Sequence, residues 1–584
     1  MGTHAKAVVL LIAAVLLTFS NSLLNGFTGD DEVIVVNNSF YKSFENLPRL
    51  FAKDYVVGSD RYFLEQNAYS DTGDVSYRPV AAFFYFLDYA AWKLNPSGYH
   101  LHSILLHLIN TLLVYFLVHR LAGEKYAAFL SALLFGIHPM KTEAVCAISY
   151  RHDLLACFFV LVSFLCYLWY SERAGLKRMF LYTASLVAFL LGVFAKESAI
   201  VLPLLIVAHD RIFREYRCAD MLRRGRSVYL GYGIAAAFYL YVYIVLFPNS
   251  AVSNNPLMGG SLASHVISMF VLFQDYIVSL CVPVFANNIP PLYAPPLTPA
   301  GAYQTLLAVG ILIFLAVIII RAYRRTRHVA FFLSWFLIAY IPVSNIIPLA
   351  NPLAHRFLYL PSVGFLAALA FALVWTEERV RGIRPLPTLG KIITFSFVGM
   401  CLITTVILNG SWQSNFVLAS GWVRDYPQDA KGYAILSIEY FKAYQCPEAK
   451  GMAQQSLALG ARDPRLPYII GMCSLDDPAA AEASFQQALA MAPAYASAYR
   501  GLGKLHLLQG HYTEAIAPLE QSAALTPAYS TYQYLIIAYM QTGQRPKALS
   551  VLKKAAAIAT DQDHFLFLKS LTEKTDETPP SRTP

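Results

Sequence analysis

The chain has 584 residues, of which 57% are apolar and 14% charged, and its mean hydropathy is +0.47. This composition excludes an ordinary soluble globular protein and predicts a polytopic membrane protein. The formal net charge of +9 does not indicate nucleic-acid binding, because the basic residues concentrate in short segments between apolar ones. From about residue 420 the long apolar runs end, which predicts a second, soluble domain.

The first apolar segment, 7–27, is long enough to cross a bilayer as a helix. No Ala-x-Ala cleavage site follows it, so we interpret it as an uncleaved anchor. Asp30, Asp31 and Glu32 come directly afterwards. Carboxylates are costly inside the bilayer, but at the end of a membrane helix they reach water, a cation or a reacting hydroxyl. Taken alone, these acids are explained most simply by solvation of the helix end.

The remaining apolar segments predict further crossings. A large loop, 28–98, is expected on the side of the acids, with an interfacial aromatic helix at 77–92. The apolar segment 265–284 is expected to lie in or dip into the outer leaflet, since a crossing there would move the basic run 321–327 to the opposite side. Eleven crossings result, at 7–27, 99–118, 126–137, 154–170, 180–195, 199–208, 228–247, 303–320, 329–347, 362–375 and 392–408.

Basic residues predict the orientation of these crossings. Five loops contain 19 Lys and Arg by count along the sequence, whereas the opposite loops contain isolated ones; they are 120–126, 171–178, 209–227, 321–328 and 377–391. Loops rich in Lys and Arg lie in the cytoplasm. An odd number of crossings then places the C-terminal domain on the other side, together with Asp30 and Asp31. That side is the periplasm of a bacterium, or the lumen of the endoplasmic reticulum in a eukaryote.

The C-terminal domain, 420–571, contains a helical repeat. Two units 33 residues apart match the tetratricopeptide spacing, and upstream residues match the second helix of a third unit. The matching residues are Tyr499, Leu502, Gly503, Ala515, Leu519 and Pro527, then Tyr532, Leu535, Tyr539, Ala548 and Leu552, and upstream Ala481, Phe485, Ala488 and Pro493. Such helix pairs stack and leave a concave groove for an extended partner. The polar, Pro-rich tail 572–584 is expected to be disordered.

Two cysteines, Cys446 and Cys473, fall in the repeat domain. They pair if the domain lies outside the cytosol, and otherwise they are two separate thiols. The sequence leaves both possibilities open.

Charged residues also gather at other helix ends on the side of Asp30. The clusters are His138–Val145 with Tyr150–Asp153, then Lys196–Glu197, and His355–Pro361. Their cations could surround a phosphate, because guanidinium groups bind phosphate oxygens in a forked geometry and ammonium groups act as point charges; they are Lys141, Arg151, Lys196 and Arg356. Mutual neutralisation of these charges is the structural alternative. A cationic pocket facing a carboxylate suits transfer from a lipid phosphate to a hydroxyl.

In this order, the motifs resemble the transmembrane and tetratricopeptide repeat containing (TMTC) O-mannosyltransferases of the GT-C superfamily, over almost the whole chain. The resemblance is carried by Asp30-Asp31 with Ile34 and Asn37, His138-Pro139 with Thr142-Glu143-Ala144-Val145, Arg151 and Asp153, Lys196-Glu197, and Arg356 with Tyr359–Phe365. Lys141 stands where the family often has His, and only three to four repeats are present. We therefore expect a bacterial relative, in which the sugar and the acceptor need not be mannose and cadherin.

The resemblance implies an all-α GT-C membrane domain, 1–415, in the bacterial inner membrane, with a periplasmic repeat domain. It implies transfer of a monosaccharide, with inversion, from a polyprenyl-phosphate donor to a Ser or Thr hydroxyl of an exported protein. The repeat groove is expected to bind this acceptor. Asp30 or Asp31 would take the hydroxyl proton; we place Asp31 ahead of Asp30, although the sequence does not distinguish them.

The other residues receive their roles from the same resemblance. Arg356, Arg151, Lys141 and Lys196 would bind the donor phosphate, and Glu143, Asp153, Glu197, His138 and Tyr359 would support them. A divalent cation, Mg²⁺ or Mn²⁺, held by the paired aspartates is a further candidate. Two alternatives stay open: a non-catalytic membrane scaffold for envelope assembly, and a ligase that transfers a lipid-linked oligosaccharide.

Overall fold

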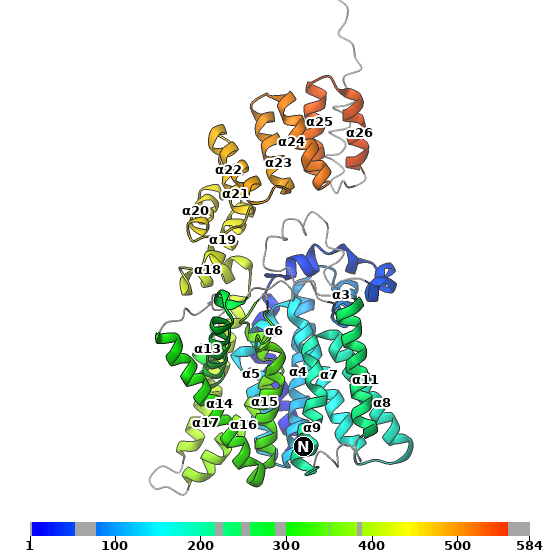
Figure 1. The fold of residues 1–584 in the computed structure, drawn as a ribbon, viewed down its shortest axis with the longest axis vertical. Helices are drawn as coiled ribbons and strands as arrows, with labels where there is room; N and C mark the ends of the chain where they lie inside the picture. Colours follow the sequence, from blue (N-terminus) through cyan, green and yellow to red (C-terminus); the bar gives the residue numbers. More distant parts are fainter. Residues whose placement is uncertain are drawn as a thin grey trace, which may run out of the picture. The chain divides into compact units, whose positions relative to one another are not determined.

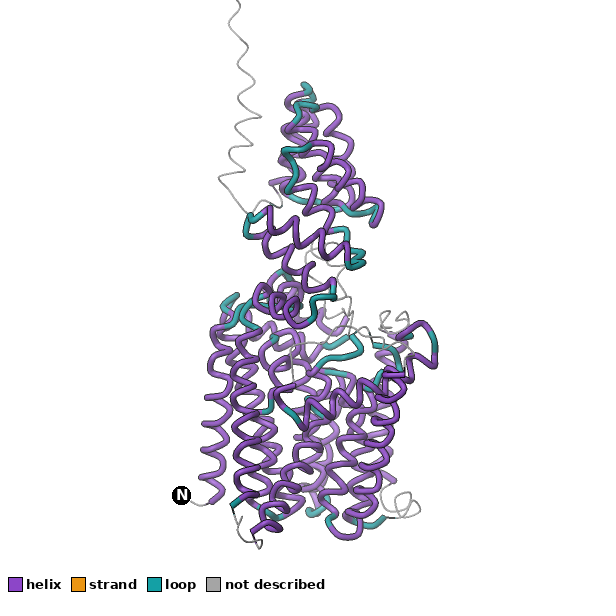
Figure 2. Tube along the Cα trace, turned by 90° about the vertical axis from the view of Figure 1, so that its left-hand side faces the viewer, coloured by secondary structure: helices purple, strands orange, loops and turns teal. Residues whose placement is uncertain are grey.

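The computed structural model describes residues 3–52, 77–216, 226–246, 257–285, 299–349, 351–381, 388–556 and 558. Every regular element within these ranges is a helix, and none of them is a strand (Figure 2). The predicted all-α architecture is therefore confirmed. The chain divides into a membrane unit that ends at Leu418 and a repeat unit that begins at Ala419 (Figure 1).

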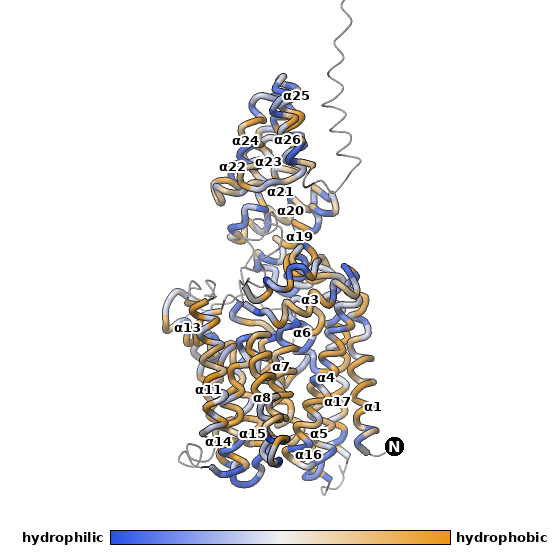
Figure 3. Tube along the Cα trace, turned by 90° about the vertical axis from the view of Figure 1, so that its right-hand side faces the viewer, coloured by the Kyte–Doolittle hydropathy of each residue, from blue (hydrophilic) through white to orange (hydrophobic). Residues whose placement is uncertain are grey.

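The membrane unit contains apolar helices, which appear orange in the hydropathy view (Figure 3). They are α1 (Thr3–Phe19), α4 (Pro96–Ala122), α5 (Lys125–Ile137), α7 (Arg151–Tyr170), α8 (Gly175–Ala195), α9 (Leu202–Phe213), α11 (Arg226–Tyr241), α13 (Leu262–Cys281), α14 (Pro299–Arg325), α15 (Arg327–Tyr340), α16 (Pro361–Arg381) and α17 (Leu389–Ser411). Shorter helices α3 (Pro79–Trp92) and α6 (Thr142–Cys146) join them. The chain is a multi-pass membrane protein.

Eight spans within the described ranges are long and apolar enough to cross a membrane: those containing α1, α4, α7, α8, α11, α13, α14 and α17. This set differs from the eleven predicted crossings. Helices α5 and α15 are apolar but shorter, and α9 has only 12 residues. Helix α13 meets the length criterion although the sequence placed 265–284 in the outer leaflet. It is one continuous helix whose Leu280 carbonyl lies 3.2 Å from Nε2 of His138.

Helices of alternating direction give the membrane unit two ends. One, the acidic end, holds Asp30 and Asp31, the start of α7 and the end of α8. The other, the basic end, holds the connections between α4 and α5, α7 and α8, and α14 and α15, together with the last turn of α16 and the first turn of α17 (Figure 1). Basic residues gather in these connections. The described parts of these Lys- and Arg-rich segments therefore lie at one end of the bundle, and the side of the membrane that this end faces stays a prediction.

A close crossing joins α15 and α16. A Cβ placed on Gly364 would lie 2.2 Å from the backbone oxygen of Phe332. Only glycine allows the two backbones to approach this closely, which is a common device in membrane helix packing. The crossing matters for the site because α16 follows directly on the segment that carries Arg356.

The repeat unit is a series of helix pairs. After α18 (Asn415–Asp425), the pairs are α19 (Ala430–Lys442) with α20 (Cys446–Ala458), α21 (Arg465–Met472) with α22 (Pro478–Met491), α23 (Ala496–Leu508) with α24 (Tyr512–Leu525), and α25 (Tyr529–Gln541) with α26 (Arg545–Ala556). Phe485 is fully buried, and its ring fills the space left by Gly471 and Gly501. The spacing predicts the pairs α23 with α24 and α25 with α26 and, upstream, the second helix of a third pair, α22, in an array of three to four pairs.

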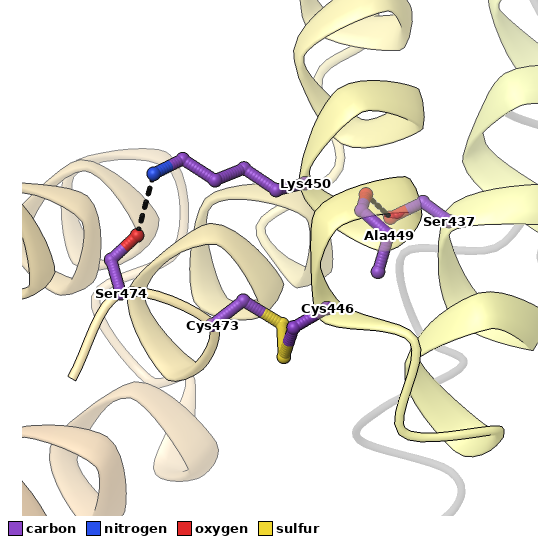
Figure 4. Close-up of a disulfide and its surroundings, with 6 residues drawn as sticks. All are labelled: Ser437, Cys446, Ala449, Lys450, Cys473 and Ser474. Atoms are coloured by element: carbon purple, nitrogen blue, oxygen red, sulfur yellow. Dashed lines mark hydrogen bonds between the residues drawn. A yellow bond between two sulfur atoms is a disulfide. The ribbon is translucent and has the colours of Figure 1, made fainter. Parts of the chain in front are cut away.

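A disulfide connects the first two pairs (Figure 4). Cys446 at the start of α20 is bonded to Cys473, the residue after α21. Of the two possibilities that the sequence leaves open, the two cysteines are therefore paired. The covalent link fixes the second pair against the first, because α21 belongs to the next repeat along the chain.

Candidate active site

Asp31 is completely buried and is held by the backbone. Its Oδ1 accepts a hydrogen bond from the Ser149 N–H at 2.6 Å, and its Oδ2 accepts from Thr28 at 3.1 Å and from Ile148 at 3.3 Å. Burial raises its pKa to about 6, against the opposing effect of these donors. Both oxygens point into the protein, so Asp31 fastens the segment after α1 to the segment before α7.

Asp30 takes a different position. It is partly exposed, and its Oδ2 accepts a hydrogen bond of 3.0 Å from the Tyr150 hydroxyl. The ring of Tyr150 lies beneath the guanidinium of Arg356, with 3.8 Å between the guanidinium carbon and the ring centroid. Tyr150 thus stands between a carboxylate and a cation. Asp30 is the more accessible of the two aspartates, whereas the sequence placed Asp31 ahead as the base; which of them accepts the proton stays a prediction.

Three ion pairs lie together beside Tyr150. Arg356 pairs with Glu143. Nζ of Lys196 lies 2.6 Å from Oδ1 of Asp153. Arg78 donates two hydrogen bonds to the Glu197 carboxylate, at 2.9 and 3.2 Å. We call these six residues the ion-pair cluster.

Contacts between the pairs make the cluster continuous. Nε2 of His152 lies 3.3 Å from Arg78 Nη1 and also 3.3 Å from Asp153 Oδ2. Lys196 and Arg356 share the Phe357 ring, at 5.1 and 5.0 Å from its centroid. Burial lowers the pKa of Lys196, and Asp153 opposes this effect.

Helix ends position the members of the cluster. Asp153 occupies the first turn of α7, where a negative charge is favourable. Lys196 follows the last residue of α8, and Arg78 precedes the first residue of α3. A side chain at a helix end leaves the hydrocarbon while its backbone stays fixed by the helix, so these groups are held firmly at the acidic end.

Lys141 does not belong to the cluster, contrary to the sequence-based grouping. Its Nζ contacts the Ser362 hydroxyl and lies 3.4 Å from the Tyr359 carbonyl oxygen, with the Phe135 ring centroid at 4.2 Å. Burial lowers its pKa to about 7. The ammonium group therefore lies in an aromatic environment inside the bundle rather than beside Arg356.

Arg151 is also separate from the cluster. It pairs with the buried Asp88 of α3, donates to the Tyr99 carbonyl at 2.8 Å and donates to the Ser103 hydroxyl at 3.2 Å. Asp88 also holds His102. Arg151 is 1% exposed, so its charge is neutralised inside the protein, where it ties α3 to α4 and α7.

The two remaining predicted supporting residues act in packing. His138 accepts a hydrogen bond of 3.3 Å from the Met140 N–H and so begins a short helical turn. The Tyr359 hydroxyl lies 2.6 Å from Nδ1 of His107 and accepts from Asn110 at 3.2 Å. Both side chains are buried in the bundle and lie outside the ion-pair cluster.

The predicted metal site receives no support from the geometry. Both Asp31 oxygens are engaged by backbone N–H groups and Asp30 by Tyr150, so the two carboxylates do not converge on one point. In the described ranges, no group of three or more His, Cys, Asp or Glu side chains could hold a metal ion.

The segment that leads to the repeat unit starts at the acidic end. The Gly29 N–H donates to Oδ1 of Asn415 at 2.7 Å, and Nδ2 of Asn415 donates to Glu32 at 3.0 Å. The Gly26 N–H donates to the Gln413 carbonyl at 2.9 Å. The chain therefore leaves the membrane unit beside Asp30, in agreement with an alternation of helices that ends on this side.

Sequence reasoning missed Arg78 and Tyr150 as site residues. The sequence places Arg78 only at the start of an interfacial helix, and Tyr150 only within a longer charged motif. The sequence does contain a signal for Arg78. It directly precedes Pro79, a typical first residue of a helix, so its side chain is expected at the same end of the bundle as the charged residues at the other helix ends. Its partner Glu197, 119 residues away, is not predictable from the sequence.

Comparisons with known proteins agree with the resemblance. A tetratricopeptide repeat family model matches residues 474–536. A Caenorhabditis elegans protein named as a protein O-mannosyl-transferase is 23% identical over 439 residues, which cover 73% of this chain and 59% of that protein. Human protein O-mannosyl-transferase TMTC1 is 34% identical over 165 residues, which cover 28% of this chain and 18% of the human protein. The chain is similar to the TMTC proteins.

The TMTC-like chain spans only part of these relatives. Mouse protein O-mannosyl-transferase TMTC3 is 32% identical over 162 residues, which cover 28% of this chain and 17% of the mouse protein. A solved structure titled "Crystal structure of YrrB: a TPR protein with an unusual peptide-binding site" is 18% identical and covers 33% of this chain and 97% of that chain, with a TM-score of 0.23. The predicted TMTC resemblance is confirmed by the named relatives and by the repeat match.

Proposed function

We propose that this TMTC-like chain is a membrane glycosyltransferase that moves a monosaccharide from a polyprenyl-phosphate donor to Ser or Thr hydroxyls of exported proteins. One observation carries the proposal: a partly exposed carboxylate, Asp30, is joined through Tyr150 to Arg356, and thereby to the ion-pair cluster, in which three cations are each paired with one carboxylate. Such a site offers a base for a hydroxyl and cations for a phosphate. The names of the relatives support transfer of a sugar to protein.

In the proposed reaction, Asp30 accepts the proton of the acceptor hydroxyl. The hydroxyl oxygen forms a bond to the anomeric carbon while the bond from that carbon to the phosphate oxygen breaks, and the electron pair of the broken bond stays on the phosphate. A single displacement inverts the anomeric centre. General-base assistance of this kind contributes a factor of about 10² to 10⁴ in rate.

Arg356, Lys196 and Arg78 stabilise the charge that develops on the leaving phosphate. Each is held by one carboxylate, so the cluster keeps its geometry without the donor. A guanidinium has five N–H donors, and Arg356 pairs with Glu143 through Nη1, so other N–H groups of Arg356 can bind phosphate oxygens. Preorganised charges in a site that excludes water supply the larger share of such stabilisation.

The site faces away from the cytosol in this proposal. The Lys- and Arg-rich connections lie at the opposite end of the bundle, as expected for cytoplasmic loops. The repeat unit, which follows from the acidic end, contains a disulfide, and disulfides persist in oxidising compartments. The acceptor protein then meets the site outside the cytosol, with the repeat groove as its docking surface.

Mass spectrometry of exported proteins from cells with and without the chain tests the function. The proposal predicts Ser- or Thr-linked single sugars that disappear when the chain is absent and return with the wild-type chain but not with Asp30→Asn. A polymer in place of a single sugar would indicate the oligosaccharide ligase. A scaffold would give a different result: cells without the chain would keep normal glycosylation but lose a protein assembly, and the Asp30→Asn chain would restore that assembly. This outcome would contradict the proposal.

A further inference from the structure

Tyr150 contacts both the proposed base, Asp30, and the proposed phosphate-binding residue, Arg356. Its hydroxyl donates to Oδ2 of Asp30 at 3.0 Å, and its ring lies 3.8 Å from the guanidinium carbon of Arg356. It is the last residue of a short helical turn, Ile148–Tyr150, whose Ile148 and Ser149 N–H groups bind Asp31. The turn that fixes the buried aspartate therefore also fixes the tyrosine.

The hydroxyl acts on the base. A donor within hydrogen-bond distance favours the ionised carboxylate, which is the form that accepts a proton. It also orients the carboxylate, because one oxygen is directed toward Tyr150. Removal of the hydroxyl alone should therefore leave Asp30 in place but make it a poorer base at low pH.

The ring acts on the cation. An arginine over the face of an aromatic ring is attracted by the ring quadrupole, and this attraction restricts the orientation of its planar guanidinium group. Glu143 holds the same arginine from another side, through its guanidinium and its backbone N–H at 2.9 Å. Tyr150 and Glu143 together leave Arg356 little freedom of orientation.

We propose that Tyr150 is a positioning residue that aligns the base and the phosphate-binding arginine with one side chain, the hydroxyl serving Asp30 and the ring serving Arg356. The inference rests on the proposed function of this site. Arg356, Glu143 and Asp30 are the charged groups that act on Tyr150, and the His152 ring lies 6.1 Å from its ring. The two halves of the side chain can be removed separately, so the roles are separable by experiment.

Tyr150→Phe removes the hydroxyl and keeps the ring. With purified full-length chain in lipid nanodiscs, mannosyl-phosphoryl-undecaprenol as donor and a Ser/Thr peptide as acceptor, we expect kcat to fall about tenfold. The KM for the donor should stay within twofold of the wild type. The acidic limb of the rate–pH profile should move to higher pH by about one unit, because the ionised carboxylate has lost a donor.

Tyr150→Leu removes the ring as well. We expect the same shift of the pH profile and, in addition, a rise of about tenfold in the donor KM, since the arginine has lost its aromatic support. Binding of undecaprenyl phosphate, which contains the phosphate but no sugar, should weaken to a similar extent in Tyr150→Leu and not in Tyr150→Phe. This split between the two variants is not expected from a general loss of packing.

Tyr126→Phe is the matched control. The Tyr126 hydroxyl donates to a carboxylate at 3.0 Å, that of Glu377 at the basic end, so the substitution removes the same kind of hydrogen bond away from the site. Its rate, donor KM and pH profile should equal those of the wild type. A Tyr150→Phe variant that equals the wild type in all three would overturn the inference, as would equal donor KM values in Tyr150→Phe and Tyr150→Leu.

The same assay separates this inference from the function on which it rests. If the wild type transfers sugar, Asp30→Asn does not, and Tyr150→Phe behaves as the wild type, the function stands and the role of Tyr150 is wrong. If the wild type transfers no sugar, or Asp30→Asn retains the wild-type rate, the proposed function is wrong and the role of Tyr150 falls with it.

Discussion

At the scale of single residues, the two adjacent aspartates show how environment decides chemistry. Asp31 is completely buried among backbone donors, whereas Asp30 is partly exposed and meets a tyrosine hydroxyl. Neighbours in sequence point in different directions, and the sequence alone does not say which is turned inward. The structural role of Asp31 and the catalytic role proposed for Asp30 therefore call for different measurements.

Asp31→Asn should lower stability rather than act on chemistry directly. An amide has one oxygen where the carboxylate has two, so at least one buried N–H loses its acceptor, at a cost of about 1–3 kcal/mol. The folded pKa of about 6 lies above the ordinary value of 3.8. Between these values the folded chain binds the proton more strongly than the unfolded chain does, so the contribution of Asp31 to stability falls as pH rises through this window.

Thermal denaturation of the full chain in detergent at pH 4.5 and pH 7.5 checks this prediction. The gap in melting temperature between the wild type and Asp31→Asn should be larger at pH 4.5. Asp30→Asn is the control, with a melting temperature close to that of the wild type at pH 7.5. An Asp31→Asn variant as stable as the wild type at both values would contradict the assigned role.

At the scale of elements, long apolar runs predict helices well, but partners across the chain are not predictable in the same way. The ranges of α4, α7, α8 and α17 follow from length and hydropathy. The pairing of cations with carboxylates depends on helix ends that meet in space. Lys141 and Arg151 carry the right charge in the right motifs, yet Lys141 turns into the bundle and Arg151 turns to Asp88.

The crossing of α15 and α16 offers a test of packing at this scale. Gly364→Ala places a methyl group 2.2 Å from the Phe332 backbone oxygen, so the helices must separate. We expect a loss of about 1–3 kcal/mol in stability, the range typical of overpacked cores. Gly399→Ala in α17 is the matched control, because no atom lies within 4 Å of a Cβ at that position. Thermal denaturation compares the two, and equal melting temperatures would contradict the close crossing.

At the scale of the whole molecule, composition and charge predict an all-helical membrane protein with a C-terminal repeat unit. The number of crossings is harder to predict from the sequence. Helices α5 and α15 are shorter than a full span, whereas α13, which the sequence placed in the outer leaflet, is long enough to cross. Short helices are stabilised by neighbours rather than by their own hydropathy. The repeat unit was predicted from three helix pairs, whereas the Cys446–Cys473 bond needed the structure.

The disulfide gives a prediction that concerns the compartment of the repeat unit. Free thiols are blocked during isolation, and the protein is then denatured and reduced. Reduction should expose two new thiols, those of Cys446 and Cys473, which the disulfide kept from being blocked. A Cys446→Ser/Cys473→Ser variant should release none, and it should be less stable by about 3–4 kcal/mol, as expected for a bond that closes 27 residues. Absence of new thiols in the reduced wild type would contradict an extracytoplasmic repeat unit.

In the proposed function, Asp30 is the base of a sugar transfer supported by the ion-pair cluster. The most direct measurement is the initial rate of sugar transfer from mannosyl-phosphoryl-undecaprenol to a Ser/Thr peptide by purified wild type and Asp30→Asn, with undecaprenyl phosphate binding measured on the same preparations. We expect a rate lower by a factor of about 10² to 10⁴ in the variant, with undecaprenyl phosphate bound as in the wild type. An undiminished rate in a folded Asp30→Asn protein would contradict it.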